Sequence, residues 1–218
     1  MARLMQIEIF SDVVCPWCFI GKRRLDAVLA TEVGQGIQVT WRPYQLYPQL
    51  PQQGLPRDEF MKARFGADAS PADIYQRILA EAATLDLALD FARIRVAPNT
   101  LRAHRLMSWA EPSGRQHELA EVLFRCYFQQ GRDVGDPAEL ALAAGEAGLD
   151  ADAAAELLRG HDELDKVRAE LALGEAVGVT GVPFFVMAGK FAIPGAQPQE
   201  VMAQLISRAR QRLVEQPS

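Results

Sequence analysis

Two short segments near the start of the chain alternate between apolar and polar residues, as a β-strand with one buried face does. In residues 6–10, isoleucines alternate with glutamine and glutamate, and in residues 37–41 apolar residues again occupy every second position. Residues 15–30 predict a helix between these strands. Its first turn contains Pro16, where the missing N–H of proline removes no hydrogen bond. The first part of the chain therefore predicts a strand–helix–strand unit.

The middle of the chain follows a different hydrophobic period. Residues 57–160 predict only helices, with apolar side chains spaced so that they share one helical face. Leu119, Leu123 and Cys126 are one such group. A strand–helix–strand unit is therefore followed by a long helical block.

The strand period returns after this block. A helix is predicted over residues 163–177, and the apolar run 183–187 has the composition of a central strand. A tight turn then leads into a strand over residues 191–193, and a last helix begins near residue 197. Because the two ends are similar and the middle differs, we predict an α/β fold with an inserted all-helical domain. The predicted boundaries are residues 1–56 and 161–218 for the α/β domain and residues 57–160 for the helical domain.

Composition and charge restrict the classes of function. Apolar residues make up 49% of the 218 positions, which argues against disorder. The formal net charge of −5 excludes the strongly basic balance of most nucleic-acid-binding proteins and gives no general attraction to anionic membranes. No apolar run approaches the ~18 residues of a membrane-spanning helix, and no leader peptide is evident. We therefore expect a cytoplasmic protein that binds neither nucleic acid nor membrane.

The sharpest chemical feature is Cys15-Pro16-Trp17-Cys18 at the predicted strand-to-helix junction. The free N–H groups and partial positive charge of a helix N-terminus favour a thiolate over a thiol. We therefore expect Cys15 to be the more exposed, attacking cysteine. The spacing places Cys18 on the same helical face, where it is able to resolve a mixed disulfide by pairing with Cys15. Trp17 adds no charge between the two thiols.

Two structural explanations compete with redox chemistry. A C-x-x-C motif is able to supply half of a zinc site, but a structural zinc takes four ligands. The sequence offers neither a second C-x-x-C motif nor paired histidines. A pair with a purely structural role is the other alternative. We favour redox use without a bound metal, and we expect the third cysteine, Cys126, to be a small buried side chain.

A second motif covers residues 178–183 and ends with Val182 and Pro183, directly before the apolar strand. Proline is unusual in a central strand. Either a trans proline at the strand start or a cis bond between Val182 and Pro183 accounts for it. The motif by itself leaves both alternatives open, and its combination with the C-x-x-C motif in this strand order favours the cis bond.

Residues 11–22, Ser-Asp-Val-Val-Cys-Pro-Trp-Cys-Phe-Ile-Gly-Lys, begin an ordered set of motifs that extends over nearly the whole chain. The chain resembles the thioredoxin-fold DsbA family, and within it the FrnE-like branch. The C-x-x-C motif alone is moderately specific, whereas the ordered set is strongly specific. The other matching segments are residues 41–44, 97–100, 103–105, 131–136, 178–185 and 195–198.

The resemblance implies a thioredoxin-like fold with an inserted all-helical domain, and thiol–disulfide oxidoreductase activity. Cys15 matches the nucleophilic cysteine and Cys18 the resolving cysteine. Val182 and Pro183 match the cis-proline loop that faces the disulfide, where the backbone of Val182 would pair with an extended substrate segment. Secreted members carry signal peptides and this sequence shows none. We therefore expect a cytoplasmic disulfide reductase or isomerase whose cysteines rest largely as a dithiol.

Several further residues are weaker candidates. Asn99 is expected to cap the next helix, with a position facing the substrate cleft as an additional role. Gly195 and Ala196 precede the last helix, whose N–H groups are able to hold a small carboxylate such as one of glutathione's. A plain helix entry is the alternative there. His104 is expected to be a hydrogen-bonded structural residue, and residues 22–24 a solvated helix face.

Two rival functions remain. Glutathione-dependent enzymes such as 2-hydroxychromene-2-carboxylate isomerases and kappa-class glutathione transferases share the fold, but they usually carry serine at the position of Cys15. The presence of both cysteines therefore favours redox chemistry. A holdase-type chaperone that binds apolar segments is the second rival. We expect protein or small-molecule thiols and disulfides as substrates, glutathione as a candidate co-substrate, no tightly bound cofactor, and either a monomer or a homodimer.

Overall fold

A mixed four-stranded sheet forms the centre of the computed structural model, which describes residues 5–68 and 70–215. The strand order is β2-β1-β5-β6. Strand β1 (Met5–Ser11) pairs in parallel with β2 (Ile37–Pro43) and antiparallel with β5 (Phe184–Met187), and β5 pairs antiparallel with β6 (Phe191–Pro194). The two ends of the chain therefore meet in one sheet, as the return of the strand period predicts.

The alternation seen in the sequence is the alternation of burial along β1. Met5, Ile7 and Ile9 are buried, Gln6 is exposed and Glu8 is half-buried. The predicted turn between β5 and β6 is also present, and Ala188 and Gly189 both adopt positive φ angles in it. These are local patterns, and the sequence predicts them correctly.

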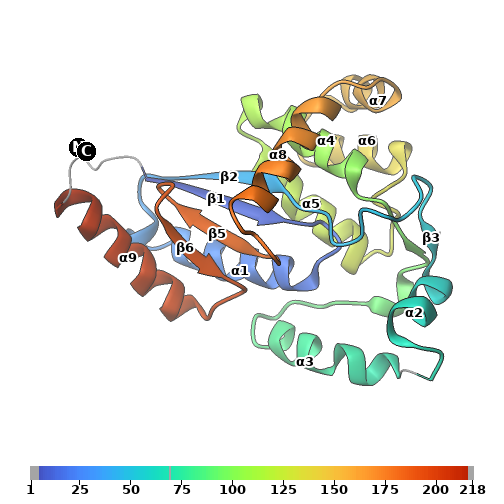
Figure 1. The fold of residues 1–218 in the computed structure, drawn as a ribbon, viewed down its shortest axis with the longest axis horizontal. Helices are drawn as coiled ribbons and strands as arrows, with labels where there is room; N and C mark the ends of the chain where they lie inside the picture. Colours follow the sequence, from blue (N-terminus) through green and yellow to red (C-terminus); the bar gives the residue numbers. More distant parts are fainter. Residues whose placement is uncertain (1–4, 69, 216–218) are drawn as a thin grey trace.

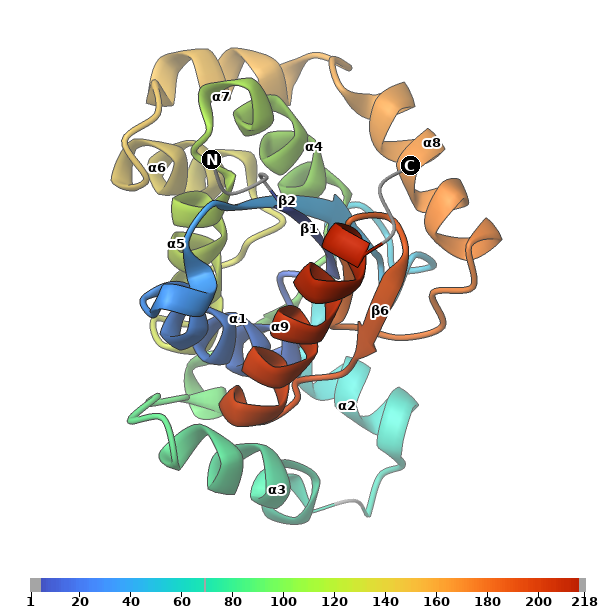
Figure 2. The same cartoon turned by 90° about the vertical axis from the view of Figure 1, so that its left-hand side faces the viewer.

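Helices cover both faces of the sheet. In Figures 1 and 2, α1 (Pro16–Leu29) and α9 (Gln199–Glu215) lie together on one side, and α8 (Leu164–Ala176) lies on the other. Because strands β1 and β2 run parallel, a crossover helix must connect them, and α1 is that helix. This arrangement is the predicted thioredoxin-like α/β fold.

The segment between β2 and α8 is largely helical, but it also contains the strand β4 (Val96–Ala97), which pairs with β3 (Leu55–Pro56). The prediction that residues 57–160 contain only helices is wrong at β4, because a two-residue strand is too short to show alternation. Short 3-10 turns lie at Glu32–Gly34, Phe91–Arg93 and Glu111–Ser113. The other helices are α2 (Arg57–Phe65), α3 (Pro71–Ala83), α4 (Leu101–Ala110), α5 (Gln116–Phe128), α6 (Pro137–Glu146) and α7 (Ala151–Arg159).

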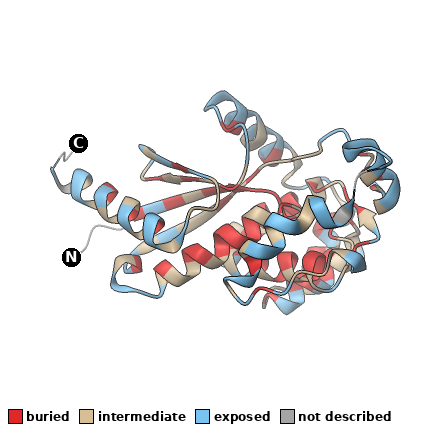
Figure 3. Ribbon diagram, turned by 90° about the horizontal axis from the view of Figure 1, so that it is seen from below, coloured by how far each residue is buried: buried red, intermediate tan, exposed pale blue. Residues whose placement is uncertain are grey.

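Aromatic side chains join the sheet, α1 and α5 in one hydrophobic core. The ring of Phe19 on α1 stacks on that of Phe124 on α5 with centroids 5.1 Å apart, and Trp41 on β2 lies 6.1 Å from Phe124. Figure 3 shows the buried residues following the sheet and the helices packed on it. Helix α5 therefore shares its core with the first strand–helix–strand unit.

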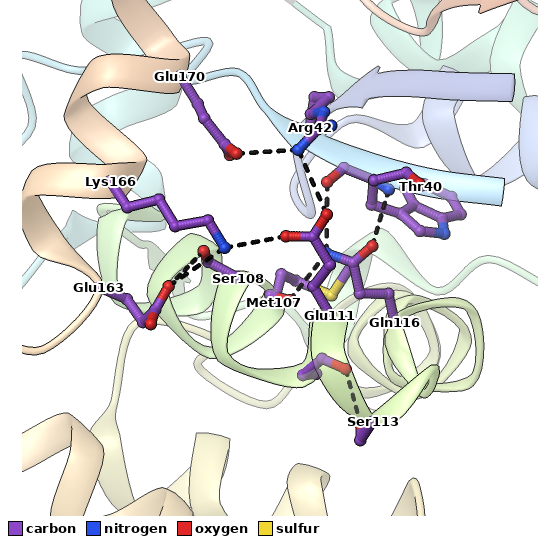
Figure 4. Close-up of polar contacts among 12 residues, drawn as sticks. Thr40, Arg42, Met107, Ser108, Glu111, Ser113, Gln116, Glu163, Lys166 and Glu170 are labelled. Atoms are coloured by element: carbon purple, nitrogen blue, oxygen red, sulfur yellow. Dashed lines mark hydrogen bonds and ion pairs between the residues drawn. The ribbon is translucent and has the colours of Figure 1, made fainter. Parts of the chain in front are cut away.

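A polar network attaches the helices to the end of β2 (Figure 4). The guanidinium group of Arg42 donates to the carboxylate of Glu8 on β1 at 2.8 Å and to that of Glu170 on α8 at 2.9 Å. Lys166 of α8 bonds to Glu111 at 2.9 Å, and Glu111 also lies 3.5 Å from Arg42. Lys166 is exposed, whereas Arg42 and its three carboxylate partners are half-buried, so the Arg42 pairs link α8 to β1 and β2.

Candidate active site

Cys15 and Cys18 lie at the start of α1, and both thiols are free. Cys15 is the N-cap residue, with extended backbone angles, and the N–H of Cys18 donates to its carbonyl oxygen at 3.0 Å. The N–H of Cys15 donates to the carbonyl of Asp12 at 3.0 Å. The exposed fractions are 3% for Cys15 and 1% for Cys18. Both side chains are therefore buried, and the access to Cys15 that was expected is limited to the cavity that it lines.

The environment of Cys18 keeps it protonated. Burial raises the pKa of the Cys18 thiol well above its usual value, and the neighbouring Cys15 raises it further. Cys15, by contrast, lines a cavity beside the N-terminus of α1, and Cys18 does not line it. Reagents approaching through this cavity therefore meet Cys15 first.

The segment before β5 approaches the thiols from the opposite end of the chain. The Sγ atom of Cys15 donates to the carbonyl oxygen of Val182 at 3.6 Å. The bond between Val182 and Pro183 is cis, the geometry favoured from the sequence. Pro183 packs against α1 at Gly21, where a Cβ atom would lie 3.0 Å from Cγ of Pro183 and 3.3 Å from Cζ of Phe185. Gly21 is thus a site residue that the sequence reasoning missed.

The cavity beside Cys15 has a volume of about 310 Å³. Of the predicted site residues, it brings together Cys15, Pro16, Trp17 and Val182. Its remaining wall comes mainly from α2, α3, α5 and the loop after β2. Sequence reasoning missed these residues, because their apolar side chains have the same spacing as core positions. Among them are Tyr47, Arg57, Phe60, Tyr75, Phe91 and Tyr127.

Three candidate binding residues do not line this cavity: Asn99, Gly195 and Ala196. The expectation that Asn99 is the N-cap of α4 is wrong by one position, because Thr100 is the N-cap residue. The Oδ1 atom of Asn99 still accepts the N–H of Leu101, the first residue of α4, at 3.0 Å, and its Nδ2 donates to the carbonyl of Leu50 at 2.7 Å. For Gly195 and Ala196, the contacts fit the plain helix entry.

The N–H of Gly195 donates to the carbonyl of Pro183 at 2.8 Å, so it is not free to join the helix N–H groups that were the candidate carboxylate site. The carbonyl of Ala196 accepts from Arg24 at 2.6 Å. These two hydrogen bonds attach the segment before α9 to the start of β5 and to α1.

A buried polar pair fixes the loop that follows β2. His104 Nε2 lies 2.9 Å from the carbonyl oxygen of Tyr44 and 3.5 Å from Oδ1 of Asp12. The other carboxylate oxygen of Asp12 accepts the N–H of Leu46 at 2.8 Å. His104 is therefore the hydrogen-bonded structural residue that was expected, and Asp12 is a partner that was not.

The expectation of a solvated face at residues 22–24 is wrong for two of the three positions. The side chains of Lys22 and Arg24 are only 4% and 9% exposed. Lys22 pairs with Asp26 at 2.8 Å and with Glu121 of α5 at 3.2 Å. Asp26 lies one helical turn away, but Glu121 and Glu81, the partner of Arg24, come from distant parts of the chain, and the local sequence does not reveal them.

Within residues 5–68 and 70–215, no group of three or more His, Cys, Asp or Glu side chains is arranged to hold a metal ion. None of the helices in the described part of the chain combines the length and the apolar character that a membrane-spanning helix needs.

Comparison with known proteins agrees with this geometry. Residues 6–207 match the family model described as the DSBA-like thioredoxin domain. The chain belongs to this family. It is 28% identical to the Bacillus subtilis protein YwbO over 205 residues, which cover 93% of this chain and 96% of YwbO. It is also similar to the crystal structure of a probable DsbA oxidoreductase from Streptomyces coelicolor. The TM-score is 0.84 at 33% identity, with coverage of 94% of this chain and 89% of that one.

More distant structures share the fold alone. A cytosolic disulfide reductase, DsbM from Pseudomonas aeruginosa, superposes with a TM-score of 0.66 at 16% identity, covering 94% of this chain and 99% of that one. A 2-hydroxychromene-2-carboxylate isomerase superposes with a TM-score of 0.67 at 14% identity, covering 98% of this chain and 100% of that one. Proteins named as a disulfide reductase and as an isomerase therefore share this fold.

Proposed function

We propose that this protein is a thiol–disulfide oxidoreductase acting as a disulfide reductase or isomerase, with Cys15 as the nucleophile and Cys18 as the resolving thiol. The observation that carries the proposal is that the two thiols have different surroundings. Cys15 lines a cavity at the N-terminus of α1, while Cys18 is buried behind it with a raised pKa. Membership of the DSBA-like family supports the same chemistry.

The reaction begins with Cys15, at the N-terminus of α1, acting as the attacking thiolate. It attacks one sulfur of the substrate disulfide, the substrate S–S bond breaks, and the departing sulfur takes up a proton. Cys18 then loses its proton, attacks Sγ of Cys15 and releases the second substrate thiol. Two electrons pass from the cysteines to the substrate, so a thiol or dithiol reductant must restore the reduced pair.

The side chains around Cys15 have positioning roles in this scheme. The carbonyl of Val182 accepts from the Cys15 thiol, and Pro183 packs on α1 beside it. Trp17 covers one side of the cavity, with the guanidinium group of Arg77 5.3 Å from its ring centroid. These contacts support an arrangement in which the sulfur is held at the end of an apolar wall.

We further propose that the protein belongs to the FrnE-like branch and works in the cytoplasm, with glutathione as a candidate co-substrate. The ordered motifs of the sequence support the branch. The neighbour DsbM is named as cytosolic, and a second DsbM structure is described with glutathione. A reduction potential close to the cytosolic glutathione poise would agree with this location.

Trapping with Cys18→Ala tests the proposal. Without the resolving thiol, the mixed disulfide at Cys15 should accumulate and be visible by non-reducing electrophoresis and mass spectrometry. The activity is measured as reduction of insulin by the wild-type protein, with dithiothreitol as the reductant. Cys15→Ser should abolish both the mixed disulfide and the reduction of insulin. Equal activity of Cys15→Ser and wild type would refute the assignment, and Cys126→Ser, which should behave as wild type, is the control.

A further inference from the structure

Arg57 places a positive charge in the wall of the cavity beside Cys15. It is the first residue of α2 and is half-buried. Among the described residues that line the cavity, it is the one with a permanently charged side chain, and none is acidic. A charged group in a mostly apolar wall loses part of its hydration, which is unfavourable unless a partner compensates.

Neutral groups hold the guanidinium group in place. Its Nη2 donates to the hydroxyl of Tyr75 at 2.5 Å and its Nη1 to the hydroxyl of Tyr127 at 3.4 Å. The ring centroid of Phe60 lies 5.6 Å from its central carbon. Across the described part of the chain, Arg57 forms no ion pair with a carboxylate. Its position is fixed, but its charge is not neutralised.

The surroundings of Arg57 do not supply the missing negative charge. Burial raises the pKa of Tyr127 and of Tyr47 above the usual 10, so both phenols are neutral at physiological pH. The nearest acidic residues along α2, Asp58 and Glu59, are exposed and do not line the cavity. An anionic group on a ligand would therefore complete the site.

The rest of the wall suits a small apolar body. A volume of about 310 Å³ lies at the lower end of the roughly 300–1,000 Å³ typical of small-molecule sites. Rings of Phe60, Tyr75 and Phe91 face the cavity, and the last two stack with centroids 3.9 Å apart. These rings offer flat apolar surfaces in the same cavity that Arg57 and Cys15 line.

Building on the proposed exchange at Cys15, we propose that this cavity selects small organic disulfides that combine an aromatic or aliphatic body with a carboxylate, which Arg57 binds. Cys15 forms a bond to one sulfur as the substrate S–S bond breaks, and the leaving thiolate takes a proton from water. Cys18 then closes the disulfide with Cys15 and releases the second thiol. The two electrons come from the reduced cysteine pair, and a dithiol reductant restores it.

Two aromatic disulfides that differ in charge test the proposal. One is 5,5′-dithiobis(2-nitrobenzoate), which carries two carboxylates, and the other is 4,4′-dithiodipyridine, which carries none. Single-turnover rates with the reduced protein are measured by stopped-flow absorbance over a range of reagent concentrations. Each rate is divided by that of the same reagent with free dithiothreitol, which removes the difference in intrinsic reactivity.

Arg57→Gln should lower the corrected rate with the dicarboxylate reagent by about tenfold, because a charged hydrogen-bonded pair is lost. The same variant should change the rate with dithiodipyridine by less than about twofold. Arg95→Gln is the matched control: it removes the same charge from an exposed position that does not line this cavity, and both rates should stay near those of wild type. Arg57→Lys should restore part of the rate with the dicarboxylate.

A second readout does not depend on turnover. 4-Nitrobenzoate should protect Cys15 of the wild-type protein from iodoacetamide better than nitrobenzene does, and Arg57→Gln should abolish the difference. Equal slowing of both disulfides by Arg57→Gln would overturn the proposal, as would equal protection of Cys15 by 4-nitrobenzoate and nitrobenzene in the wild-type protein. Absence of any Cys15-dependent exchange would instead refute the proposed function itself.

Discussion

The Sγ atom of Cys15 lies 3.6 Å from the carbonyl oxygen of Val182, although 167 positions separate the two residues in the chain. The contact joins the N-terminus of α1 to the segment that leads into β5. Both segments are anchored in the same sheet, since β1 and β5 are neighbouring strands. The position of the attacking sulfur therefore depends on both ends of the chain.

Alkylation should distinguish the three cysteines. With iodoacetamide near pH 7, we expect Cys15 to be labelled first, because all three cysteines are buried but Cys15 is the one that lines the cavity. Burial also raises the pKa of Cys126 from 9.0 to about 11, which lowers its thiolate fraction at neutral pH by about a hundredfold. Peptide mapping by mass spectrometry gives the order.

The control for this labelling is the unfolded protein. In urea all three cysteines should react at similar rates, since burial no longer acts on them. Labelling of Cys18 or Cys126 ahead of Cys15 in the folded protein would contradict the assignment.

Gly21→Ala should destabilise the protein by about 1–3 kcal/mol, because the new methyl group would overpack the contact with Pro183. The same substitution at Gly145, an exposed helical position where the new methyl group would lie 3.4 Å from Cβ of Ala151, should be neutral or stabilise by up to ~1 kcal/mol. Urea unfolding of the two variants measures both effects. Opposite signs support the packing role of Gly21, and equal stabilisation would contradict it.

Asn99→Ala should weaken the loop after β2. It leaves the buried carbonyl of Leu50 without its donor, at a cost of about 1–3 kcal/mol in the free energy of unfolding. Gln45→Ala removes a single bond to Asn99 and should cost less than about 1 kcal/mol. Chemical denaturation compares the two variants, and an equal loss in both would show that the bond to Leu50 is not the important one.

Asp26 gives a pH-dependent contribution to stability. Burial alone would raise its pKa, but the hydrogen bond from His117 and the charge of Lys22 outweigh burial and lower the pKa below 3.8. Because the folded pKa is lower than the unfolded one, this stabilisation is present above pH ~4 and is lost as the pH falls through the folded value. The difference in unfolding free energy between wild type and Asp26→Asn should therefore shrink as the pH falls from 5 to 2.5. A difference that stays constant down to pH 2.5 would contradict this.

Local patterns account for what the sequence predicts well. The alternation in β1, the proline in the first turn of α1 and the motif before β5 each lie within a few neighbouring residues. They place Cys15, Cys18 and Val182 correctly. Residues whose roles depend on distant partners are predicted poorly. Lys22 belongs to a helix face that the local pattern assigns to solvent, and its burial depends on Glu121 of α5.

The cavity wall shows the same limit. Arg57 follows Pro56 in a stretch whose local sequence indicates only a helix start. Its place beside Cys15 depends on Tyr75 and Tyr127, which are contributed by α3 and α5. The residues next to Arg57 in the sequence do not predict that contact. The position of the two cysteines at the start of α1 is thus predictable from sequence, whereas the wall of the cavity beside Cys15 requires the fold.

The loop after β2 is fastened at three points by buried or half-buried side chains: Asp12 binds the N–H of Leu46, His104 the carbonyl of Tyr44 and Asn99 the carbonyl of Leu50. Ordering the backbone of one residue costs roughly 1–2 kcal/mol in conformational entropy. Here that entropy is lost when the chain folds, before any ligand arrives. A ligand that touches Leu46, Tyr47 or Leu50 therefore meets a wall that is already rigid, and more of the contact free energy is left for affinity.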